Sequence, residues 1–173
     1  MPGPGRGLGA IVLLAVLFAI LILGGDEEGG DPAGAGGADR GPLRGEVTRV
    51  VDGDTVEVEL GGTVDDVRLI GVDTPESVQP GEPVECFGAE ASAFTRELLE
   101  GEAVRLELDR ERRDAYDRLL AYVYLRDLFV NAELVRQGYA RTLEIAPNTA
   151  HAEQLAKLER EAGSTGAGLW SVC

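Results

Sequence analysis

Between residues 46 and 72, apolar and polar residues alternate in runs that are separated by glycine-containing turns. Asp52-Gly53 follows the first run and Gly61-Gly62 follows the second, and both dipeptides are typical of tight hairpin turns. Alternation places the apolar side chains on one face of each strand. We therefore expect a meander of antiparallel strands with one buried face, over residues 46–51, 55–60 and 63–72.

The rest of the chain alternates between helical and strand patterns. Further strands are expected over 103–108 and 119–125, and helices over 89–99, 131–137 and 150–162. Asn131 is interpreted as an N-cap, Gly138 as a C-cap, and Gly163 as the end of the last helix. This order predicts an α+β, mainly β fold: a five-stranded Greek-key barrel of the OB type with three helices.

A nearly unbroken apolar run, residues 8–23, precedes this pattern. Arg6 lies before the run, and Asp26, Glu27 and Glu28 follow it. This charge asymmetry predicts that the N-terminus lies on the inner side of the membrane and the rest of the chain on the outer side. Either a cleaved signal peptide or an uncleaved membrane anchor fits residues 1–25. Residues 26–42 are rich in Gly, Ala and Asp, as in a flexible linker, and the folded domain is expected over 43–173. The domain is therefore predicted to be extracytoplasmic, membrane-anchored or secreted.

The charge of the chain limits its function. The formal net charge is -15 and Lys157 is the one lysine, which argues against a broad basic surface for nucleic acid. An enzyme needs only a local positive pocket and a metal ion. The single histidine, His151, excludes catalytic sites that need several histidines.

Carboxylates and arginines gather in three short segments, 51–56, 68–76 and 116–118. Asp54 and Asp73 can hold a hard divalent cation, and Glu76 can activate water. The two arginines Arg68 and Arg118 can hold a phosphate. Taken singly, the same residues are ordinary turn formers or solvated charges; together they indicate cleavage of phosphodiester bonds.

These motifs, in this order, resemble the staphylococcal nuclease family across residues 45–171. The resemblance implies an OB-fold barrel with three helices and Ca²⁺-dependent hydrolysis of DNA and RNA to 3′-phosphate ends. The segments that carry it are 52–55, Arg68 with 72–76, 88–95, Asp114 with Tyr116 and Arg118, 120–124, Asn131, 134–138 and 168–171.

The resemblance also implies a calcium site. Asp54 and Asp73 match the family's calcium carboxylates, and the carbonyl of Thr74 matches its backbone ligand. Asp52 is expected to tune the metal without touching it.

The same comparison assigns the groups that act on the phosphate. Glu76 matches the general base, while Arg68 and Arg118 match the guanidinium groups that stabilise the transition state. Tyr116 resembles a hydroxyl that contacts phosphate.

Three features depart from the family pattern. Asp117 stands where glycine is common and is expected to pair with Arg118 and lower its availability. The segment 140–147 lacks the tyrosines that stack on a base, and Leu143 and Glu144 stand near that place. The loop 77–85 has no Lys or Arg, so electrostatic capture of a polymer is expected to be weak.

Two other functions compete with the enzyme: a catalytically inactive OB-fold module that binds nucleic acid or protein at the cell surface, and a tethered structural protein. The intact set of reactive residues favours the enzyme, with DNA and RNA as substrates. The membrane is a partner through the N-terminal segment if that segment is uncleaved, and no protein partner is implied.

Cys86 and Cys173 are the only cysteines. In an exported domain they are expected to form a disulfide, which would anchor the loop next to Glu76. The alternative is two separate thiols.

Overall fold

The computed structural model describes residues 41–77 and 83–173. Five strands form a closed barrel, because β3 pairs with β6 in addition to its hairpin partner β2. The main sheet runs in the order β3-β2-β1-β5-β6-β7. Its strands are β1 (Leu43–Asp52), β2 (Thr55–Leu60), β3 (Thr63–Leu69), β5 (Ala103–Glu107), β6 (Leu119–Leu125) and β7 (Leu128–Phe129).

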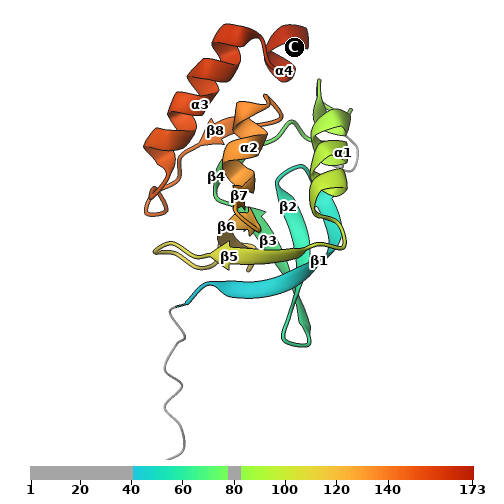
Figure 1. Cartoon of the computed structure of the whole chain (residues 1–173), viewed down its shortest axis with the longest axis vertical. Helices are drawn as coiled ribbons and strands as arrows, with labels where there is room; N and C mark the ends of the chain where they lie inside the picture. The colour runs from blue at the N-terminus through green and yellow to red at the C-terminus, as the bar shows by residue number, and fades with distance from the viewer. Residues whose placement is uncertain (1–40, 78–82) are drawn as a thin grey trace, which may run out of the picture. The chain divides into compact units, whose positions relative to one another are not determined.

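The helices cover one end and one side of the barrel (Figure 1). α1 (Gly88–Leu99) packs against β1, and α2 (Val130–Arg136) packs against β6 and α3 (Ala152–Thr165). The short α4 (Leu169–Val172) follows α3. The predicted mainly β barrel with three helices is confirmed, with α4 as an addition.

Alternation in the strands produces the core. The inward positions of β1 and β2 hold Val47, Val56 and Val58, all fully buried, while the residues between them are more exposed. Leucines from the other elements complete the same core. Burial of large apolar side chains supplies most of the driving force for folding, so the pattern read from the sequence is the one that closes the barrel.

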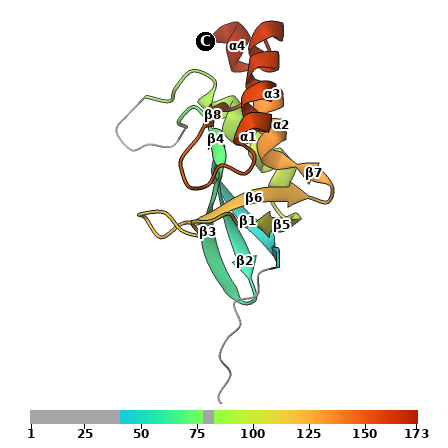
Figure 2. The same ribbon diagram turned by 90° about the vertical axis from the view of Figure 1, so that its left-hand side faces the viewer.

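The predicted third strand, 63–72, is correct through Leu69 and wrong in its last three residues. The strand breaks after Leu69, and β4 (Gly71–Asp73) leaves the barrel to pair with β8 (Arg141–Leu143), as Figure 2 shows. Gly71 has φ +79, and a Cβ there would lie 2.6 Å from Leu155. Positive φ is available to glycine at little cost, so this residue permits the turn that redirects the chain.

The predicted ends of two helices are also corrected. α3 continues through Gly163 and ends at Gly166, whose φ of +66 makes it the C-cap. Asn131 is not an N-cap, since Phe129 occupies that position and Asn131 lies inside α2.

Asn131 is fully buried and joins two strands instead. Its Oδ1 accepts from the N–H of Val123 at 2.9 Å, and its Nδ2 donates to the carbonyl of Ile70 at 2.8 Å. The amide therefore ties β6 to the point where the chain turns from β3 into β4.

The predicted disulfide is present. Cys86 and Cys173 are bonded, with Cα atoms 5.9 Å apart and a sequence separation of 87. The bond connects the segment before α1 to the end of α4.

The predicted signal or anchor segment and most of the predicted linker lie outside the described residues. In the part of the chain that the structure does describe, no helix has the length and apolar character needed to cross a membrane.

We predict that Asn131→Leu lowers the free energy of unfolding by about 3 kcal/mol, because it leaves a buried N–H and a buried carbonyl without partners. Chemical denaturation of the purified protein measures the change. The matched control is Gln154→Leu on the exposed face of α3, which we expect to alter stability by less than about 0.5 kcal/mol. Equal effects from the two substitutions would contradict the bridging role of Asn131.

Candidate active site

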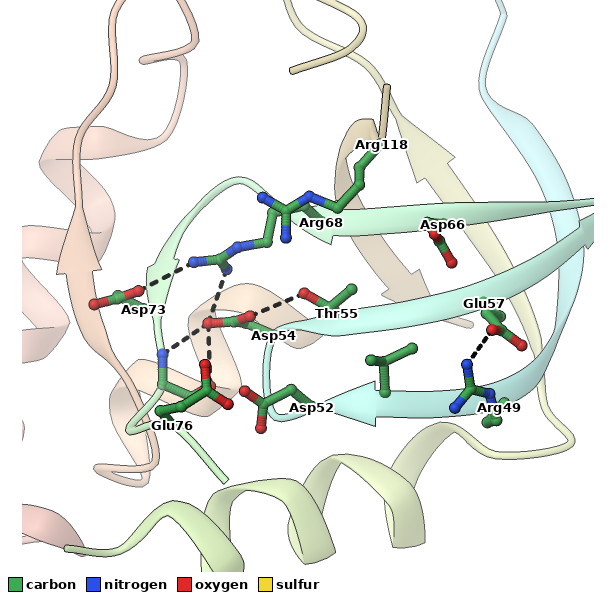
Figure 3. Close-up of a pocket in the computed structure, with 12 residues that line it drawn as sticks. Arg49, Asp52, Asp54, Thr55, Glu57, Asp66, Arg68, Asp73, Glu76 and Arg118 are labelled. Carbon is green, nitrogen blue, oxygen red and sulfur yellow. Dashed lines mark hydrogen bonds and ion pairs between the residues drawn. The ribbon is translucent and has the colours of Figure 1, made fainter. Parts of the chain in front are cut away.

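A pocket of about 450 Å³ lies where the β1–β2 turn, the end of β3, the end of β4 and the start of β6 come together. Figure 3 shows its side chains. The pocket brings together seven of the residues that the sequence singled out: Asp52, Asp54, Arg68, Asp73, Thr74, Glu76 and Arg118.

The tight β1–β2 turn places Asp54 in the pocket. Asp52 pairs with Thr55, so the two-residue turn is Gly53-Asp54, one residue later than predicted. The turn is packed closely, because a Cβ at Gly53 would lie 2.7 Å from Thr74 Oγ1. From the other side, Thr95 of α1 donates its hydroxyl to the carbonyl of Gly53 at 2.7 Å. Asp54 is thus held on a rigid support.

Asp54 is 5% exposed, and its carboxylate is surrounded by donors. Oδ2 accepts from the backbone N–H of Thr74 at 2.8 Å and from its hydroxyl at 3.1 Å. Oδ1 accepts from the hydroxyl of Thr55 at 3.2 Å. These three hydrogen bonds fix the orientation of the carboxylate.

Arg68 lies between two carboxylates. Its Nη1 is 2.9 Å from Asp54 Oδ2, and its Nη2 is 3.1 Å from Asp73 Oδ1. Nη1 also donates to the carbonyl of Val72 at 2.9 Å, and only 15% of the side chain is exposed. The guanidinium group is therefore fixed, and Asp54 and Asp73 converge on one positive charge.

The electrostatics of the pocket favour cations. Partial burial raises the pKa of Asp73; the Arg68 charge opposes this effect, while Asp54 and Glu85 add to it. Six carboxylates but only three arginines line the pocket. Oxygen donors of this kind suit a hard divalent ion, so the donor set fits calcium. Among residues 41–77 and 83–173, however, no three Asp, Glu, His or Cys side chains already surround one point.

Glu76 lies beside Asp52 at the end of the pocket nearest α1 (Figure 3). The N–H of Ser77 donates to Glu76 Oε1 at 3.0 Å, and the Ser77 hydroxyl donates to Asp52 Oδ1 at 2.6 Å. Burial raises the pKa of Asp52; hydrogen bonds from Ser77 and Gly53 oppose that rise, and the neighbouring Glu76 carboxyl adds to it. Ser77 therefore orients both carboxylates, a role that no sequence pattern had indicated.

Arg118 reaches the pocket from the segment before β6. Its Nε and Nη2 both lie 2.7 Å from Asp114 Oδ2, and its backbone N–H donates to Oδ1 at 3.0 Å. Burial acts to raise the pKa of Asp114, but these hydrogen bonds outweigh it and lower the pKa. Asp114 therefore stays ionised and holds Arg118.

The prediction that Asp117 pairs with Arg118 is wrong. Asp117 is 89% exposed, and its carboxylate lies 3.7 Å from Arg113. Its φ of +66 belongs to the tight turn at residues 114–118. The Asp114–Arg118 spacing of four was visible in the sequence, but outside a helix this spacing does not imply contact.

Tyr116 does not line the pocket. It is 83% exposed, and the Arg118 guanidinium lies 5.5 Å from the centre of its ring. Tyr116 is therefore not among the residues that line the pocket with Asp54, Arg68 and Glu76, although its ring lies near Arg118.

A second pocket, of about 340 Å³, adjoins the first and shares Arg68 and Arg118 with it. Its walls are largely apolar, and of the two residues expected near the place of the missing tyrosines, Leu143 lines the pocket and Glu144 does not. The apolar side chains that line it are Ile70, Val72, Ala115, Leu120, Leu143 and Ile145.

Comparison with known proteins matches this chain to one family. A family model described as "Staphylococcal nuclease homologue" matches residues 66–172. The chain is 38% identical to a thermonuclease of Staphylococcus hyicus over 161 residues, which is 92% of this chain and 95% of that protein.

Two further relatives agree. A thermonuclease of Staphylococcus intermedius is 44% identical over 131 residues, covering 74% of this chain and 78% of the relative. The SPbeta prophage-derived endonuclease YokF of Bacillus subtilis is 42% identical over 125 residues, covering 71% of this chain and 42% of the relative. With the barrel and the residues of its pocket, these matches establish that the chain belongs to the staphylococcal nuclease family.

Proposed function

We propose that the protein is a nuclease, and more finely that it uses Ca²⁺ to hydrolyse DNA and RNA to 3′-phosphate ends. The observation that carries the proposal is one pocket in which two carboxylates, a fixed arginine, a second arginine and Glu76 face the same space. The names of the relatives, thermonuclease and endonuclease, agree with it.

In this proposal Glu76 takes the proton of a water molecule whose oxygen attacks phosphorus. The bond from phosphorus to the 5′-oxygen breaks, the leaving oxygen takes a proton from solvent water, and Glu76 returns to solvent the proton that it accepted. Arg68 and Arg118 donate to the phosphate oxygens, whose negative charge grows in the transition state. Arg68 is already fixed by Asp54, Asp73 and Val72, so little reorganisation is needed during the reaction.

Calcium would be held by the carboxylates of Asp54 and Asp73 and by the carbonyl of Thr74. When bound, such an ion neutralises phosphate charge and polarises the phosphoryl group. The hydrogen bonds from Thr74 and Thr55 orient the Asp54 carboxylate for that role.

The surroundings of the pocket bear on the choice of substrate. The second, apolar pocket is placed to take a nucleobase next to the phosphate held by Arg68 and Arg118. Its aliphatic side chains offer apolar surface to a base of any kind, while Glu111 and Asn148 are the polar groups besides Asp114 and the arginines that could contact the edge of the base. The net charge of -15 predicts weak electrostatic capture of long polymers.

The competing function is an OB-fold module that binds without cleaving. Hydrolysis of denatured DNA by the purified protein, measured with Ca²⁺ and again after chelation, separates the two. The nuclease proposal requires cleavage that the chelator abolishes; binding without cleavage under both conditions would favour the alternative.

We predict that Glu76→Gln lowers kcat about 10²-fold, because the amide cannot accept the proton of the attacking water. Asp54→Asn is expected instead to raise the Ca²⁺ concentration needed for half-maximal activity. Steady-state kinetics on denatured DNA across a calcium titration measure both effects. Glu97→Gln on the exposed face of α1 is the matched control, and wild-type kinetics from both site variants would refute the assignment.

We predict that Arg118→Lys lowers kcat by a factor of about 10² or more, because the planar fork is lost although the charge remains. Asp114→Asn should lower kcat by a smaller factor, since it releases Arg118 from its charged partner. Asp117→Asn is the control and should leave kcat within about twofold. A larger loss of kcat in Asp117→Asn than in Asp114→Asn would show that Asp117, and not Asp114, holds Arg118.

Asp114 also predicts a pH dependence of stability. Because folding lowers the pKa of Asp114, its ionised carboxylate stabilises the folded protein at every pH above the unfolded-state pKa of about 4. This stabilisation is lost as the pH falls through the pKa of Asp114 in the folded protein. The stability difference between wild type and Asp114→Asn should therefore shrink on acidification.

We also propose that the domain acts outside the cytoplasm. The Cys86–Cys173 bond supports this, since structural disulfides persist in oxidising compartments. We expect protease added to intact cells to release or degrade the domain. Complete protection until the cells are lysed would refute export.

A further inference from the structure

Residue 85 forms a reciprocal pair of hydrogen bonds with the backbone of Glu76. The N–H of Glu76 donates to Glu85 Oε2 at 3.0 Å, and the N–H of Glu85 donates to the carbonyl of Glu76 at 2.9 Å. Glu76 lies beyond the end of β4, where no strand pairing holds the chain. The contact with Glu85 therefore fixes the main chain that carries the proposed general base.

The start of α1 supports the same contact. The N–H of Gly88 donates to the carbonyl of Glu85 at 3.0 Å. Gly88 also packs directly on Glu76, since a Cβ at Gly88 would lie 2.5 Å from the Glu76 carbonyl oxygen. Glu85 thus holds the backbone of Glu76 by hydrogen bonds, and Gly88 packs against it.

Little apolar burial holds the segment that bears Glu85, because residues 83–86 are all exposed. The covalent restraint next to it is the bond from Cys86 to Cys173. The far end of that bond is anchored: Leu169 of α4 is buried, and its N–H donates to the carbonyl of Gly138 at 2.9 Å. The disulfide thus connects residue 85 to the body of the protein.

We propose that Glu85 is a positioning residue for Glu76, and that the Cys86–Cys173 disulfide holds Glu85 in place. The rate of the reaction then depends on the oxidised bond, although neither cysteine touches the pocket. The activity part of this inference rests on the proposed nuclease function; the structural part, that the bond orders the backbone at Glu76, does not.

The test compares the full-length oxidised protein with the same protein after reduction by a dithiol. Reduction transfers two electrons and two protons to the bond, leaving two thiols and a cyclic disulfide of the reagent. We expect kcat on denatured DNA to fall 10- to 100-fold, the range in which small misplacements of a catalytic group act. KM and the half-saturating Ca²⁺ concentration should change less than threefold. Reoxidation should restore kcat.

Substitutions distinguish the positioning of the Glu76 backbone from the charge of Glu85 and from the stability of the domain. Glu85→Ala keeps the disulfide and should lower kcat to a similar extent, while Glu85→Gln keeps an acceptor for the Glu76 N–H and should restore most of it. Glu90→Ala, an exposed glutamate in the first turn of α1, is the matched control. The Cys86→Ser/Cys173→Ser double variant should resemble the reduced protein and should not respond to dithiol.

A second readout is independent of activity. Hydrogen exchange of the Glu76 amide should be slow in the oxidised protein and faster after reduction or Glu85→Ala, at a temperature where circular dichroism shows the reduced domain folded. If reduction unfolds the domain, Glu85→Ala alone decides. The proposal is overturned if the exchange of the Glu76 amide is the same in the oxidised protein and in Glu85→Ala. It is also overturned if the enzyme is active and Glu85→Ala leaves kcat unchanged, or if Glu85→Gln loses as much kcat as Glu85→Ala. Changed exchange in a protein without nuclease activity would support the positioning and refute the nuclease function.

Discussion

The ion pairs of Arg68 with Asp54 and Asp73 are the contacts on which the arrangement of the pocket depends. One guanidinium group joins the β1–β2 turn, the end of β3 and the end of β4. Two carboxylates brought this close would repel each other strongly without a cation between them. The arginine offsets that repulsion and leaves the carboxylates facing the same space, which is the condition for a divalent ion to be shared between them.

Much of the barrel could be predicted from the sequence, because alternation reports directly which side chains are buried. The strand at 55–60 and the strand at 119–125 have the predicted bounds. The predictions of secondary structure are wrong where the conformation or contacts of one residue depend on residues far away in the sequence. Gly71 breaks a strand whose apolar pattern continues through it, and Asn131 serves two strands rather than the start of its own helix.

The candidate site shows the same division. The sequence identified the reactive groups, and the pocket brings Asp54, Arg68, Asp73, Glu76 and Arg118 together. It did not identify the groups that hold them, because Asp114, Ser77 and Glu85 act through the geometry of turns and loops. Asp117 was chosen as the partner of Arg118 since it is adjacent in sequence; the turn instead brings Asp114 onto that guanidinium.

The barrel closes through only three register pairs, between β3 and β6. Arg68 stands on one of these strands, where it pairs with Leu120, and Arg118 directly precedes the other. The two arginines therefore flank the seam of the barrel. Local opening of this seam would separate them, but Val67, Leu69 and Ala121 on the seam are buried, and core strands open only at free energies that approach that of global unfolding. The buried seam that closes the barrel therefore also keeps the phosphate site assembled for as long as the domain stays folded.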